Sequence, residues 1–223
     1  MVTTSIPGST GAGKPGNPAL PVRSRRIVDA PTRMFHALFA LCFLGAYVTS
    51  EGESMRLLHV TLGYSMAGLL VFRVVYGLVG PRHARLSLLW RKLQTAPQWL
   101  GSVRQSLSGR AGVVVNWRQG QNLLMALAVV LLLVLVVPIT LSGYATYNDW
   151  GDVLGGDWIE EVHEFFGEAM LFVVLAHLAL IAGLSMLRRK NQALPMLTGR
   201  VEGPGPNLVQ KNRTWLAAAL LLA

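Results

Sequence analysis

One apolar stretch near the end of the chain, residues 161–187, limits the fold most strongly. It reads EVHEFFGEAMLFVVLAHLALIAGLSML and is long enough to cross a bilayer as a helix, for which about 20 apolar residues suffice. It nevertheless contains two histidines, His163 and His177. At about 1.5 Å and about 100° per residue, the interval between them places both imidazoles on nearly the same face of the helix, about 21 Å apart. Because ionisable side chains are costly inside a membrane and usually functional there, this stripe predicts two sites at two depths.

Three further apolar runs complete a predicted all-α membrane protein, and 52% of the 223 residues are hydrophobic. Its four-transmembrane-helix bundle occupies residues 25–190, with helices at about 32–50, 55–79, 121–142 and 161–187. Residues 1–24, rich in Gly, Pro, Ser and Thr, are predicted to be a disordered arm. Residues 191–223 are predicted to be a basic linker with an apolar C-terminal segment. That segment, TWLAAALLLA, is either an interfacial segment or part of a fifth helix.

The charges predict how the bundle is oriented. The formal net charge is +9, and the basic residues precede the first run, separate the second from the third, and follow the fourth. Acidic residues occupy the other two loops, so the positive-inside rule places the N-terminus in the cytoplasm. Basic loops between apolar runs are typical of contact with anionic membrane lipid, and no nucleic-acid partner is expected. One cysteine and no CxxCH motif exclude an intrachain disulfide and covalent c-type haem.

This topology sorts four histidines into two pairs of matched depth. His59 and His163 lie on the outer side, whereas His36 and His177 lie nearer the cytoplasm. A haem with two axial imidazoles is the group such pairs would bind, because neutral imidazole binds iron and a bundle core accommodates the flat macrocycle. The alternative for any single membrane histidine is a hydrogen bond across helices. Four histidines that pair by depth favour ligation.

Three further residues are candidates for contacts with such haems. Gly63 and Gly167 each follow an outer histidine by four residues and share its helix face, where the missing side chain leaves room for a porphyrin. Arg73 follows His59 by the same interval that separates His163 from His177, which places Arg73 at the depth of the inner pair. We expect it to pair with a haem propionate, and the alternative is an arginine that snorkels to the interface. His83, in the basic loop, is expected to be solvated.

Several segments, in this order, resemble the bacterial cytochrome b561 family, particularly its hydrogenase-type cytochrome b subunits: DAPTRMFHALFALCFLGAY, LLHVTLGYSMAGLLVFRVVYGLVGPRHAR and VHEFFGEAMLFVVLAHLALIAG. The resemblance covers about residues 25–190 and implies a four-helix bundle that binds two haem b groups. By motif, it implies the iron ligands His36, His59, His163 and His177. It also implies a bacterial cytoplasmic (inner) membrane protein of the respiratory chain that uses quinone.

We therefore expect single-electron transfer through two bis-histidine haems, between a quinone/quinol pool and a redox partner. That partner would be a cytochrome c or a dehydrogenase or hydrogenase subunit. Three alternatives stay open: a superoxide:quinone oxidoreductase, which is an activity known in the family, a haem-bearing anchor subunit of a larger redox complex, and a haem-free structural bundle. The sequence does not decide between electron carrier and oxidoreductase subunit, and no catalytic residue is predicted.

Overall fold

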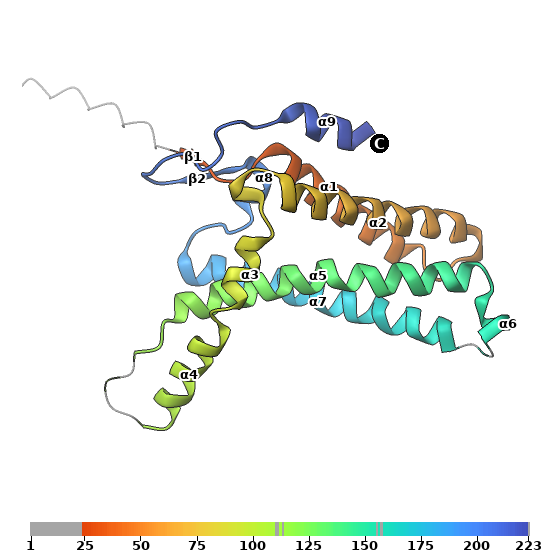
Figure 1. Ribbon diagram of the computed structural model, residues 1–223, viewed down its shortest axis with the longest axis horizontal. Coiled ribbons are helices and arrows are strands. Elements are labelled where there is room, and N and C mark those ends of the chain that lie inside the picture. The colour runs from red at the N-terminus through yellow and green to blue at the C-terminus, as the bar shows by residue number, and fades with distance from the viewer. Residues whose placement is uncertain (1–23, 110–111, 113, 155, 157, 223) are drawn as a thin grey trace, which may run out of the picture.

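The computed structural model describes residues 24–109, 112, 114–154, 156 and 158–222 (Figure 1). The predicted all-α membrane bundle is confirmed, because four helices in this part of the chain are long and apolar enough to cross a membrane. These helices are α1 (Ala30–Val48), α2 (Arg56–Val79), α5 (Trp117–Tyr147) and α7 (Trp158–Arg188). The predicted disordered arm, residues 1–24, lies outside the described residues except for Ser24.

The four long helices form two antiparallel hairpins that lie side by side (Figure 1). One hairpin contains α1 and α2, the other α5 and α7, and α2 packs against α5 to join them. The connection between α1 and α2, with the short turn η1 (Glu53–Met55), lies at the same end as α6 (Trp150–Leu154). Since these connections carry Glu51, Glu53, Asp149 and Asp152, we call this the acidic end. The opposite end, where α1 begins and α2 ends, is the basic end.

Local sequence signals explain where the long helices begin and end. The side chain of Asp29 caps α1 by accepting a hydrogen bond from the Thr32 amide at 3.2 Å. Asn116 caps α5 in the same way, at 3.1 Å from the Gln119 amide. At the end of α2, Gly80 takes an extended conformation before Pro81, so the helix cannot continue.

A small apolar core lies at the middle depth of the bundle. Met66 of α2, Val136 of α5 and Met170 of α7 are buried together, and Phe39, Cys42 and Phe43 of α1 pack against them. Met170 lies midway between His163 and His177 in the sequence, about 10 Å along the helix from each. This core therefore separates the two histidine levels.

At the basic end, the predicted linker and the predicted basic loop contain short helices and a two-stranded sheet. The loop after α2 contains η2 (Arg82–Ala84), α3 (Ser87–Leu93) and α4 (Ala96–Leu107), and α3 packs against α5. After α7, the chain forms α8 (Leu194–Thr198) and β2 (Arg200–Glu202), which pairs antiparallel with β1 (Ser24–Arg26). The apolar C-terminal segment forms α9 (Thr214–Leu222), which packs beside α1 (Figure 1). The segment before α1 and the segment after α7 are thus joined at the basic end.

Candidate functional site

The outer histidine pair, His59 of α2 and His163 of α7, meets between the two hairpins. The ring centroids are 6.0 Å apart and the ring planes are nearly perpendicular, at 85°. The two side chains are therefore brought together as their matched depth predicts.

Backbone carbonyls orient both rings of the outer pair. His59 Nδ1 lies 2.8 Å from the carbonyl oxygen of Ala46 on α1, and His163 Nδ1 lies 3.1 Å from that of Ile139 on α5. A carbonyl oxygen only accepts, so each Nδ1 carries the proton and donates. Each Nε2 is then left with a free lone pair, as in metal-binding histidines whose second nitrogen is held by the protein.

The spacing of the outer rings matches two axial ligands on one metal ion. A metal–imidazole bond is about 2 Å, and a ring centre lies roughly 1 Å behind its nitrogen, so two opposed imidazoles on one ion have centres about 6 Å apart. Within the residues that the structure describes, no third His, Cys, Asp or Glu joins either pair to form a metal cluster. A metal held here would take its other ligands from a group such as a porphyrin. The outer pair fits a bis-histidine haem.

Helix α5 carries no histidine, yet it positions His163. A Cβ atom added to Gly143 would lie 2.8 Å from Cε1 and 3.1 Å from Nδ1 of His163, so the imidazole sits directly against this glycine. The neighbouring Ser142 hydroxyl lies 3.2 Å from the same Nδ1. Sequence reasoning assigned no site residue to this helix and missed both residues. In the sequence, the only sign of this role is that two small residues, Ser142 and Gly143, interrupt a lipophilic run.

The two glycines predicted to make room for porphyrins face open space. A Cβ atom added to Gly63 or Gly167 would meet no atom within 4 Å. Each lies one helical turn beyond its histidine, on the same face. No protein atom therefore occupies these positions, and the role of the two glycines in haem packing stays a prediction.

The inner pair, His36 of α1 and His177 of α7, is less constrained by the protein. Each of the two residues lies in the half of its helix that is nearer the basic end. Nδ1 of His177 is buried and has no hydrogen-bond partner among the described residues. The side chain of His36 is exposed on the bundle surface. Because unpartnered polar atoms are costly in hydrocarbon, both imidazoles fit the role of ligands to a bound group.

Arg73 has a protein partner at the depth of the inner pair. Its guanidinium donates to the carbonyl oxygen of Ala84 in η2 at 3.0 Å and also lies within electrostatic range of Asp29. The contact with Ala84 fixes the loop that follows α2. A guanidinium has five N–H donors, so this bond leaves others for a second acceptor.

His83 is not a solvated loop residue, and that expectation was wrong. Its side chain is only 12% exposed, and Nε2 lies 3.0 Å from Oδ2 of the fully buried Asp29. The Tyr76 hydroxyl donates to the same oxygen. Burial alone would raise the pKa of Asp29, but the hydrogen bonds from Thr32, Tyr76 and His83 outweigh it and hold the pKa below its ordinary value. Sequence reasoning missed this cluster because its members lie up to 54 residues apart.

Four membrane helices, with two histidines of different helices whose rings meet inside the bundle, are features of a membrane cytochrome. Residues 27–199 match the model of the family described as prokaryotic cytochrome b561, and the chain belongs to this family. It is accordingly a multi-pass membrane protein that binds b-type haem and transfers electrons as a transmembrane cytochrome b. Comparisons with curated proteins and with solved structures gave no match.

Proposed function

We propose that residues 25–190 hold two haem b groups, an outer one between His59 and His163 and an inner one between His36 and His177. They would pass single electrons between a quinone/quinol pool and a redox partner. The outer pair carries this proposal, because its 6.0 Å ring spacing and carbonyl-bonded Nδ1 atoms match axial ligation. Each haem, when bound, supplies a reversible one-electron iron couple.

The protein's own residues favour electron transfer over chemistry at iron. With two imidazoles holding the iron at each level, no position would be left at which oxygen or a substrate could bind. Between the levels, Met66, Val136 and Met170 form an apolar layer that excludes water. The His163 and His177 side chains, about 21 Å apart along α7, place one site near each end of the bundle.

We propose that the basic end faces the cytoplasm of a bacterial inner membrane and the acidic end faces outward. Support comes from the distribution of arginine and lysine between the two ends. At the acidic end, Glu160, Glu161 and Glu164 are exposed in the first turns of α7, next to the His163 level. A basic protein such as a cytochrome c would be attracted to this surface by complementary charge.

The test is quinol-driven haem reduction in liposomes that contain the purified protein, with an acceptor protein outside. Quinol should reduce both haems, and the external acceptor should reoxidise them. The Glu160→Gln/Glu161→Gln/Glu164→Gln variant should slow reoxidation by a basic cytochrome c and leave reduction by quinol unchanged. If superoxide were the preferred electron donor, the protein would be a superoxide:quinone oxidoreductase and not an electron carrier. A stoichiometric redox subunit that co-purifies and is required for reduction would make the chain an anchor subunit.

For Arg73 we propose a second contact, to a propionate of the inner haem. Its depth supports this, because the interval from His59 to Arg73 equals the interval from His163 to His177. Arg73→Leu should shift the midpoint potential of the inner haem and leave the outer one unchanged. Arg85→Leu is the matched control, since Arg85 also anchors this loop, by donating to the Gly80 carbonyl oxygen at 3.3 Å. Equal effects of the two variants, or no shift in Arg73→Leu, would reduce Arg73 to a loop anchor.

A further inference from the structure

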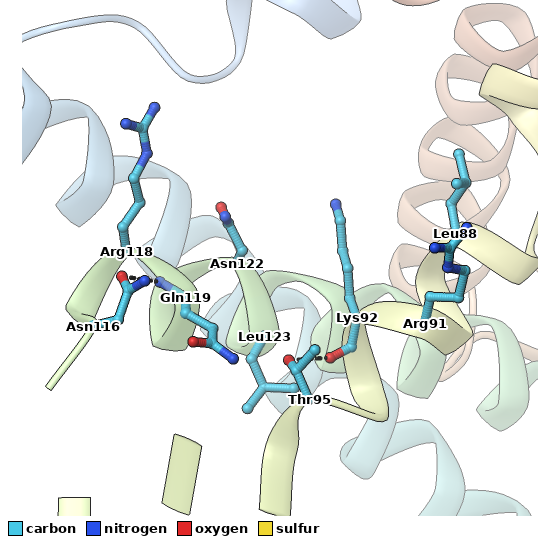
Figure 2. Close-up of a pocket in the computed structure, with 9 residues that line it drawn as sticks. All are labelled: Leu88, Arg91, Lys92, Thr95, Asn116, Arg118, Gln119, Asn122 and Leu123. Carbon is cyan, nitrogen blue, oxygen red and sulfur yellow. Dashed lines mark hydrogen bonds between the residues drawn. The ribbon is translucent and has the colours of Figure 1, made fainter. Parts of the chain in front are cut away.

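A basic hollow of about 540 Å³ lies between α3 and α5 at the basic end (Figure 2). Arg91 and Lys92 of α3 and Arg118 of α5 line it, and Leu88 and Leu123 supply apolar surface. Figure 2 shows the Lys92, Arg118 and Asn122 side chains extending in the same direction from their helices. Two helices that are distant in sequence thus present three cations around one opening.

These cations have no acidic partner in the described structure. The segment 81–120, which forms most of the hollow, contains no aspartate or glutamate. The ion pair found in the described part of the chain joins His83 to Asp29, and neither residue lines the hollow. Neutral hydrogen-bonding groups, including the amide of Asn122, complete the polar lining. This combination attracts a group with several anionic oxygens, such as a phosphate.

The hollow lies at the depth of lipid headgroups. Helix α5 has 31 residues and is about 46 Å long, whereas the hydrocarbon core is about 30 Å thick. Its first turns are polar at Arg118, Gln119, Gln121 and Asn122, and the lipophilic run follows from Leu123. Trp90 and Trp117, each next to a lining cation, are 62% and 65% exposed. Exposed tryptophans of this kind mark the membrane interface, so these first turns lie among headgroups.

We propose that this hollow binds the headgroup phosphate of an anionic phospholipid, with the acyl chains along the lipophilic surface of α5. A free phosphate shares the anionic chemistry. The apolar lining and the interfacial depth favour the lipid, because a soluble anion gains nothing from Leu88 and Leu123. The site is separate from the four histidines and does not depend on the proposed electron pathway.

The experiment measures lipid binding to the full-length, haem-loaded protein in neutral detergent by native mass spectrometry. The probes are phosphatidylglycerol, phosphatidylcholine, glycerol 3-phosphate and inorganic phosphate. Each cation near a membrane surface contributes about fivefold to the affinity for anionic lipid, so Arg91→Gln/Lys92→Gln/Arg118→Gln should weaken phosphatidylglycerol binding roughly a hundredfold. Arg104→Gln/Arg189→Gln/Lys190→Gln removes the same charge from this end, outside the hollow, and should change binding about twofold or less.

Equal weakening in the two triple variants would show general attraction to the basic end and overturn the site. Phosphate or glycerol 3-phosphate binding as tightly as the phospholipid would make it a soluble-anion site instead, and phosphatidylcholine binding equally well would exclude anion recognition. The haem absorption spectrum reports whether each variant is folded. If the first triple variant does not fold, Asn122→Asp, which adds one negative charge to the hollow, is expected to weaken phosphatidylglycerol binding about fivefold. Unchanged binding in that variant would refute the proposal.

Discussion

The contact between Gly143 and the His163 ring makes the sharpest prediction about the outer site. In Gly143→Ala, the new Cβ would lie 2.8 Å from Cε1 of the imidazole, whereas carbon atoms pack at about 3.5–4.0 Å. The ring must therefore move by about 0.7 Å or more. Its Nδ1 is 3.1 Å from the Ile139 carbonyl oxygen, so a shift of this size would stretch the hydrogen bond beyond its normal range.

Loss of such an orienting contact typically lowers metal affinity about 10–100-fold. Gly143→Ala should therefore lose much of the outer haem while it retains the inner one. The assay is haem content per chain by pyridine haemochrome, together with the low-spin signals of the two proposed haems in electron paramagnetic resonance. Gly68→Ala is the matched control, because a Cβ at Gly68 of α2 would meet no atom within 4 Å. Full haem content and unchanged signals in Gly143→Ala would refute the assigned role of this glycine.

Two further predictions concern stability. Met170 is 0% exposed between the two histidine levels, so Met170→Ala should lower the free energy of unfolding by about 2–5 kcal/mol and retain both haems; unchanged unfolding in denaturant would contradict the packed central layer. The pKa of Asp29 is held below its ordinary value of 3.8 in the folded protein, so its charge stabilises the fold above that pH and this contribution is lost as pH falls through the folded pKa. The free energy of unfolding of Asp29→Asn should thus be lower than that of the parent at pH 7, and the difference should shrink towards pH 3. Asp152→Asn, at an exposed position, is the control and should show neither effect. A pH-independent difference for Asp29→Asn would argue against the ionised carboxylate.

The sequence was sufficient to predict the four helices and the meeting of His59 with His163. Both depend on quantities that are local to each helix: the length of an apolar run, and the rise between residues within it. The loop charges then set the direction of each helix and so the depth of each histidine. Those three quantities determine which residues share a level in the bundle.

The rest depended on how helices rotate and approach one another. The carbonyl oxygens of Ala46 and Ile139 are backbone groups that every residue carries, so no side-chain pattern marks them as partners of the histidines. His83 looked like one more polar residue in a basic loop. Its burial arises because η2 folds back over the start of α1 and brings it to Asp29. Likewise, the pairing of β1 with β2 joins the segment before the first membrane helix to one that follows the last.

Each haem is proposed to have its own pair of histidines, one pair at each level of the bundle. The most direct test is the haem content of the purified His59→Ala and His163→Ala variants, with the remaining haem identified by its electron paramagnetic resonance signal and midpoint potential. Both variants should contain one haem per chain, and it should be the same inner haem in each. Loss of both haems or of neither, or loss of different haems in the two variants, would contradict the pairing of His59 with His163.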